Sequence, residues 1–228
     1  MVISMTTKIR KYASWLKGQS LKFNEWVIIF GYVLIWLYAG TVTGIKGSYL
    51  LAGSFTLLLI FYLLWLRPKI RRLSWKNSVE AIALGLLPLM VELMFLLIVM
   101  QFNNHIIGNS NTSLIVKLLQ KNIIYVAYVV IIAPVLEEIV FRKSFFHRVD
   151  AWLASWVDNS KLRVGISAFI VATVFAQMHG ASIGIIYILL SLYFQFIYLH
   201  FSNLEMNIIA HITFNTSTLG LMVLASSM

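Results

Sequence analysis

The chain has 228 residues, of which 60% are hydrophobic and only 11% are charged, and its formal net charge is +10. Soluble domains carry about 25% charged residues, so this composition excludes an ordinary soluble protein or a disordered chain and is typical of a helical membrane protein. The excess of Lys and Arg is expected beside anionic lipid head groups, and no nucleic-acid partner is predicted. The sequence contains no cysteine, which excludes disulfides, thiolate metal ligands and a cysteine nucleophile.

Seven apolar stretches are long enough to cross a bilayer, because a crossing helix needs about 20 residues. The first four cover residues 27–45, 48–66, 79–100 and 122–141. An uncharged run of 41 residues lies between Arg163 and Glu205, and we divide it into two spans between His179 and Gly180. A further 23 uncharged residues follow Glu205. We therefore predict an all-α bundle of about seven transmembrane helices, with six and eight as neighbouring alternatives, in a single membrane domain over residues 1–228.

The distribution of positive charge predicts the orientation of the chain. Segments 1–25, 67–76 and 142–163 each hold five Lys or Arg residues, whereas the opposite side holds three in all. Positively charged loops face the cytoplasm, so the N-terminus is expected there and, with seven spans, the C-terminus outside. Segment 1–25 lacks a short apolar core followed by a small-residue cleavage site, so we expect it to remain as a cytoplasmic segment.

The segment after the fourth stretch, residues 144–158, carries apolar side chains at helical spacing and charged side chains on the other face. This pattern predicts an amphipathic helix that lies on the cytoplasmic interface of the membrane. A short helix packed into the protein core would show the same periodicity and is the alternative.

Two adjacent carboxylates, Glu137 and Glu138, interrupt the apolar fourth stretch. A charge at mid-membrane costs about 2.5–3.5 kcal/mol on insertion scales, so such residues are candidates for function. Glu138 and Arg142 have the i,i+4 spacing of a helical ion pair with the acid first. Because neighbours on a helix point about 100° apart, Glu137 is expected to face another direction without a local counter-ion, as a general base requires. A structural polar cluster at the end of the span is the alternative interpretation.

Two further i,i+4 pairs lie on later stretches. Phe175 and His179 end the fifth stretch, where the ring could brace the imidazole, and His211 and Asn215 share one face of the seventh. An imidazole and an amide can both donate hydrogen bonds to an oxyanion. Each pair alone is also typical of hydrogen bonds and packing between membrane helices.

Three motifs occur in order on separate spans, namely Glu137-Glu138-x-x-x-Arg142, Phe175-x-x-x-His179 and His211-x-x-x-Asn215. Together they resemble the CPBP family (CAAX protease and bacteriocin-processing), intramembrane proteases also called the Abi or CAAX-protease-like family. The resemblance implies catalytic core spans over 121–226, accessory spans over 27–100, and hydrolysis of a peptide bond in the membrane. The short, basic chain is similar to bacterial members, which implies the bacterial cytoplasmic membrane, a peptide or membrane-protein substrate, and a role in bacteriocin processing, self-immunity or pheromone maturation.

The family's residue roles are carried over to the matching positions of this chain. The resemblance implies that Glu137 and His179 bind and activate the attacking water, and that His211 and Asn215 stabilise the oxyanion of the tetrahedral intermediate. It also implies a supporting role, holding the geometry of the site, for Glu138, Arg142 and Phe175. These roles agree with the local reading of the two carboxylates, in which only one of them lacks a partner.

Zinc is a further question, because the family has been described as metalloprotease-like. Glu137, His179 and His211 could offer three zinc ligands with an open fourth position. However, the sequence has no His-Glu-x-x-His motif, and Asn215 is a poor zinc ligand, so we expect direct activation of water without a cofactor. A non-catalytic immunity factor or scaffold of the same fold and a proton-coupled transporter are the competing functions, and the substrate and the oligomeric state are not predicted.

Overall fold

The structure is a computed structural model that describes residues 23–39, 41, 44–66, 72–102, 123–179 and 184–226. Every regular element in these ranges is helical. The first elements are α2 (Phe23–Ala39), α3 (Gly44–Phe61) with its π-helical continuation η1 (Tyr62–Leu66), and α4 (Trp75–Phe102). The next are α6 (Ile123–Ala127), the π-helical η2 (Tyr128–Ile132), α7 (Ala133–Glu137), the π-helical η3 (Glu138–Phe145) and α8 (Phe146–Leu153). The last are α9 (Ser160–Met178), α10 (Gly184–Phe201) and α11 (Leu204–Ser226).

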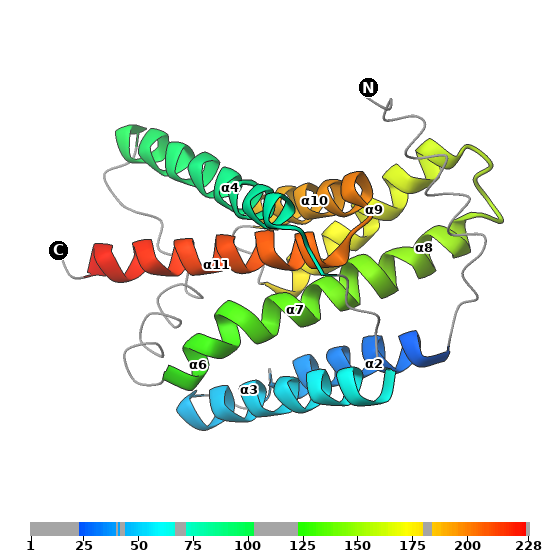
Figure 1. Cartoon of the computed structure of the whole chain (residues 1–228), viewed down its shortest axis with the longest axis horizontal. Coiled ribbons are helices and arrows are strands. Elements are labelled where there is room, and N and C mark those ends of the chain that lie inside the picture. The colour runs from blue at the N-terminus through cyan, green and yellow to red at the C-terminus, as the bar shows by residue number, and fades with distance from the viewer. Residues whose placement is uncertain are drawn as a thin grey trace.

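Elements α6 to α8 follow one another without a break and form one long rod in the middle of the bundle (Figure 1). The pair α2 and α3 packs against this rod on one side, and α11 packs against it on the other. Helix α4 lies along α11, while α9 contacts both α8 and α10. The rod is therefore enclosed by helices that come from both halves of the sequence.

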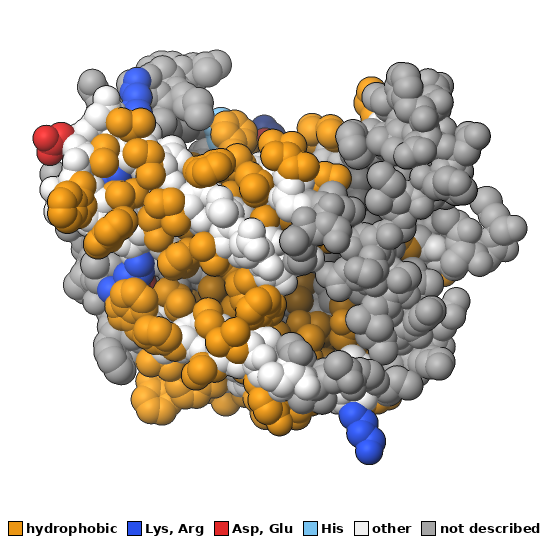
Figure 2. Space-filling model, turned by 180° about the vertical axis from the view of Figure 1, so that it is seen from behind, with side chains coloured by type: hydrophobic (Ala, Val, Ile, Leu, Met, Phe, Trp, Pro, Cys, Tyr) orange, Lys and Arg blue, Asp and Glu red, His pale blue; other side chains and the backbone are white. Residues whose placement is uncertain are grey.

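The described surface is suited to lipid. Within the described ranges, five helices are long and apolar enough to cross a membrane, namely Lys46–Trp65, Ile124–Leu153, Ser160–Met178, Gly184–Phe201 and Leu204–Leu224. Figure 2 shows one face on which hydrophobic side chains cover most of the described surface and charged side chains are few. Large apolar side chains such as Leu34, Leu57 and Leu189 are exposed, which is unfavourable in water and favourable in a bilayer. The protein is a multi-pass helical membrane protein.

Most of the expected spans are found. The predicted division of the long uncharged run is confirmed, because α9 ends at Met178 and α10 begins at Gly184. The third and seventh stretches are covered by α4 and α11. The first stretch differs, because α2 begins already at Phe23 and its apolar part, Glu25–Tyr38, is shorter than a full crossing. Most of segment 1–25 lies outside the described residues.

The predicted interfacial helix over 144–158 is wrong as a separate element. Residues up to Leu153 continue the central rod, and a turn and a short irregular stretch then lead to Asn159. The apolar face of this segment, with Phe146 and Val149, is buried in the protein core, while Trp152 on the other side is exposed. The core-packing alternative is closer to the structure, since periodicity shows that a face is apolar but not what covers it.

Side-chain caps fix where the last helices begin. Asn159 accepts hydrogen bonds from the backbone N–H groups of Lys161 and Leu162 and so starts α9. Between α10 and α11, Ser202 adopts a positive φ of 50°, and Asn203 then accepts a hydrogen bond from the backbone N–H of Met206. This tight link places α11 directly beside α10.

Gly85 allows α4 to approach α11 closely, and we expect its replacement by Ala to destabilise the bundle. A Cβ atom at this position would collide with the backbone oxygen of Ala210 and would lie 2.7 Å from the Cβ of Thr213. Overpacking of this kind costs about 1–3 kcal/mol. The thermal midpoint of the detergent-purified protein should therefore fall for Gly85→Ala.

The matched control is Gly31→Ala on α2. The added Cβ would meet only the end of the Leu58 side chain, at 2.9 Å, and this end can rotate away. Equal loss of stability in the two variants would contradict the close helix crossing at Gly85.

Candidate active site

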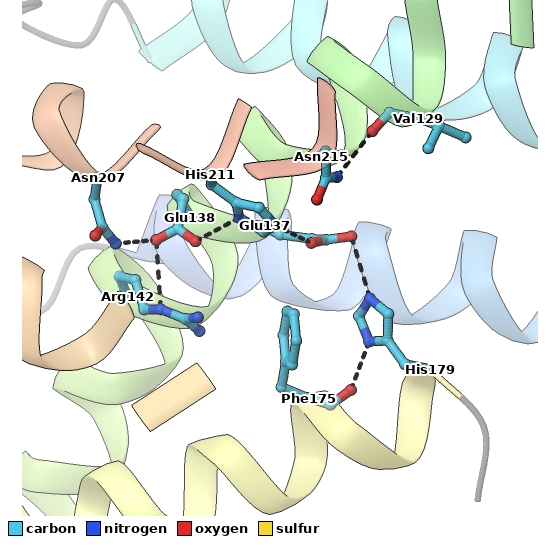
Figure 3. Close-up of polar contacts among 9 residues, drawn as sticks. All are labelled: Val129, Glu137, Glu138, Arg142, Phe175, His179, Asn207, His211 and Asn215. Carbon is cyan, nitrogen blue, oxygen red and sulfur yellow. Dashed lines mark hydrogen bonds and ion pairs between the residues drawn. The ribbon is translucent and has the colours of Figure 1, made fainter. Parts of the chain in front are cut away.

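The two carboxylates lie at the junction of α7 and η3 in the central rod, and both are buried, with Glu137 7% and Glu138 0% exposed. Figure 3 shows the two side chains pointing in different directions, as expected for neighbours on a helix. Glu138 faces α11, whereas the carboxylate of Glu137 lies between α9 and α11. The carboxylates therefore have separate surroundings.

Three side chains contact the carboxylate of Glu138. The Nδ1 atom of His211 lies 2.8 Å from Oε1, the side-chain amide of Asn207 donates to Oε2, and the Nε atom of Arg142 lies 3.4 Å from Oε2. The predicted ion pair with Arg142 is thus present, and both partners are fully buried. With both oxygens engaged, this carboxylate is suited to hold its neighbours in place.

Glu137 faces two imidazoles. Its Oε1 atom lies 3.8 Å from Nε2 of His179, and its Oε2 atom lies 3.6 Å from Nε2 of His211. Both distances exceed the 2.7–3.2 Å of a direct hydrogen bond. The structure therefore brings together three of the four side chains that the resemblance marked as catalytic, with a small gap between the carboxylate and each ring.

The contact made by Nδ1 shows which nitrogen of each imidazole carries the hydrogen. The Nδ1 atom of His179 lies 2.8 Å from the backbone oxygen of Phe175, and Nδ1 of His211 faces the Glu138 carboxylate. Since an oxygen acceptor requires a donor, both Nδ1 atoms carry the hydrogen. In the neutral rings, Nε2 is then a bare acceptor aimed at Glu137. A water molecule placed between Glu137 and His179 would donate to both, which leaves its lone pairs free for attack.

Aromatic rings hold both imidazoles. The His179 ring lies between Phe175, at 4.2 Å between centroids, and Tyr187, at 4.7 Å. The ring of Phe194 stacks on His211 at 4.5 Å. The predicted contact of Phe175 with His179 is present. The guanidinium of Arg142 lies over the same Phe175 ring, with its Cζ atom 5.2 Å from the ring centroid. Stacked rings restrict the rotation of an imidazole, as a preorganised site requires.

Asn215 lies one turn beyond His211 on α11, and its side-chain amide donates a hydrogen bond of 3.1 Å to the backbone oxygen of Val129. A proline explains why this oxygen is available. The N–H of Ala133 bonds five residues back to Tyr128, and in that π-helical register residue 134 would bond to Val129. Pro134 has no N–H, so Asn215 provides the missing donor. The second N–H of the amide remains for another acceptor.

The described residues contain no group of three or more His, Asp or Glu side chains placed to hold a metal ion. The zinc ligand set considered from the sequence does not form such a group. We therefore derive no step through a metal.

Asn207 is not among the residues predicted from the sequence, yet it is fully buried and donates to Glu138. It precedes His211 by four residues, so the spacing rule that singled out Asn215 also reaches it. The sequence leaves the role of Tyr187 undecided, because a tyrosine in an apolar stretch carries no local signal. Of the remaining membrane acids, Glu80 is exposed on α4, and the side chain of Glu92 lies outside the described residues.

Comparison with protein families identifies the region that carries this geometry. The model of the type II CAAX prenyl endopeptidase Rce1-like family matches residues 119–217. Residues 119–217 are thus similar to the Rce1-like family. The match covers the central rod, α9, α10 and much of α11, and it confirms the resemblance to the CAAX-protease-like proteins. Comparisons with curated proteins and with solved structures found no significant match. Because the Rce1-like family is a protease family, the match supports a protease.

Proposed function

We propose that the protein is an intramembrane endopeptidase in which Glu137 and His179 activate a water molecule for attack on a peptide bond. The observation that carries this proposal is the convergence of two fixed imidazoles, through their bare Nε2 atoms, on one buried carboxylate. A base held near its reacting partner contributes about 10²–10⁴-fold to a proton-transfer step. The family match supports the same class of reaction.

The proposed reaction moves one proton from the water to the leaving nitrogen. As the water oxygen bonds to the scissile carbonyl carbon, its proton passes to Glu137. The carbonyl oxygen becomes an oxyanion, which accepts a hydrogen bond from the second N–H of Asn215 and, while Nε2 of His211 holds the proton passed on by Glu137, a further one from that ring. The two carboxylates that flank His211 stabilise that cation. Glu137 then returns the proton to the leaving nitrogen as the C–N bond breaks, and the enzyme regains its initial state.

We further propose that the chain is a bacterial cytoplasmic-membrane protein with its N-terminus inside, built as one domain. Its substrate would be a peptide held at the membrane, such as a bacteriocin or pheromone precursor, and cleavage could confer bacteriocin self-immunity. The matched family is described by its action on prenylated CAAX proteins, which are also membrane-anchored chains. A non-catalytic immunity factor or scaffold of the same fold would bind such a partner without cutting it.

The decisive experiment is mass spectrometry of peptides released from candidate lipid-anchored and membrane-inserted substrates by the purified protein in vesicles. We expect a discrete cut with the wild-type chain and none with Glu137→Ala. A parallel reaction with a chelator should keep its activity. Loss of activity that zinc restores would contradict direct activation of water, whereas the absence of any cut across the substrate panel would favour the scaffold.

A further inference from the structure

Helix α2 belongs to the first part of the chain, outside the residues that the family model matches. It nevertheless packs against η3, which begins with Glu138. One side chain on this face, Tyr32, is 5% exposed, and its hydroxyl lies near enough to Glu137 for the two groups to interact. The proposed general base is therefore contacted by a helix for which the motifs give no role.

The ring of Tyr32 is held in place on both sides. It packs against Phe55 of α3, with centroids 4.8 Å apart, and meets Phe141 of the central rod edge to face at 5.7 Å. These contacts tie the position of the hydroxyl to the same rod that carries Glu137. A tyrosine held in this way loses little further rotational freedom when its hydroxyl binds a partner.

The hydroxyl of Tyr32 can donate a hydrogen bond to Glu137, which the two neutral imidazoles cannot do. In their neutral forms, His179 and His211 direct bare nitrogens at Glu137, so neither donates a hydrogen bond to the carboxylate. A buried carboxylate requires donors, and a tyrosine hydroxyl is a donor that remains protonated near neutral pH. Tyr32 is thus the neutral side chain in contact with Glu137 that can orient it before water binds.

A second contact from the same face supports this placement. Trp36 lies one turn after Tyr32, and its Nε1 atom donates a hydrogen bond of 3.1 Å to the backbone oxygen of Met178. This oxygen is in the last turn of α9, where carbonyl groups lack helical partners, and His179 follows directly. One face of α2 therefore contacts both Glu137 and the residue that precedes His179.

We propose that Tyr32 is a positioning residue of the active site, whose hydroxyl orients Glu137 for proton transfer. This inference rests on the proposed peptidase function and extends the site to a helix outside the family match. The residue acts through Glu137 and touches neither water nor substrate in the proposed reaction, so its removal should slow the chemical step and leave substrate binding unchanged.

The test is Tyr32→Phe, which removes the hydroxyl and keeps the ring. We expect kcat to fall about tenfold, the order expected for one hydrogen bond to a charged group, with KM and the thermal midpoint unchanged. The matched control is Tyr125→Phe, which removes the hydroxyl of another buried tyrosine on the central rod and should keep full activity.

The outcomes separate the two proposals. A wild-type chain without hydrolysis would overturn the peptidase function and this inference with it. If Tyr32→Phe cleaves the substrate as fast as the wild-type chain does, only the proposed role of Tyr32 is overturned. A loss of kcat that is matched by an equal fall in Tyr125→Phe, or by loss of folded protein, would also overturn it, because packing alone would then explain the effect.

Discussion

Replacement of Glu137 by Gln is expected to lower kcat by at least about 10²–10⁴-fold while the protein still folds. Gln has the shape of Glu, so the packing around this buried position is kept. The amide cannot accept the proton of water, and its NH₂ group would donate to Nε2 of His179 or His211, which occupies the nitrogens that should hold the water. The measurement is the rate of peptide release in vesicles, together with the thermal midpoint.

The matched control for this variant is Glu80→Gln, because Glu80 is exposed on α4. It removes the same charge from the same chain and should keep the wild-type rate. Full cleavage by Glu137→Gln would contradict the proposed base. If Glu137→Gln cleaved no peptide but still conferred full bacteriocin immunity, the result would instead favour a binding role for the same fold.

The sequence predicts those features of the site that are local to one helix. The pair Glu138 and Arg142 and the contact of Phe175 with His179 both follow from i,i+4 spacing, and both are present. Different directions for Glu137 and Glu138 follow from the helical rotation of about 100° per residue. These predictions need only the geometry of a single helix, which a short motif contains.

Contacts between helices could not be predicted in the same way. The bond from His211 to Glu138 joins residues 73 positions apart, and the contact of Tyr32 with Glu137 joins residues that are even further apart in the sequence. Only the packing of the bundle selects these partners. The resemblance to a family indicated that Glu137, His179 and His211 converge, but it gave no indication for Tyr32, which lies outside the matched residues.

Local helix geometry also departs from what a regular pattern suggests. The sequence shows Pro134 and permits a kink, but it does not show that the neighbouring segments take a π-helical register or that Asn215 satisfies the carbonyl left open. For the same reason the amphipathic pattern over 144–158 predicts a helix on the membrane surface as readily as one in the protein core. Its apolar side chains fit lipid and protein equally well, and only the packing of α8 against α9 decides between them.

The second large effect is expected for Arg142→Ala, which leaves the buried carboxylate of Glu138 without its cation. Removing one partner of a buried ion pair costs about 3–5 kcal/mol, so the thermal midpoint should fall sharply and activity should fall with it. Asn207→Ala removes a neutral donor from the same carboxylate and should cost less, about 1–3 kcal/mol. The order of the two losses tests whether charge or hydrogen bonding dominates around Glu138.

A double variant, Glu138→Gln with Arg142→Met, separates stability from positioning. The terminal nitrogens of Arg142 have no hydrogen-bond partner among the described residues, so the ion pair is incompletely compensated and its removal as a pair should restore much of the stability. His211 would still lose the carboxylate that fixes its Nδ1 proton, because an amide can present either a donor or an acceptor to the ring. We therefore expect a protein that is stable but remains slow. Recovery of both stability and rate would show that the orientation of His211 does not depend on the charge of Glu138.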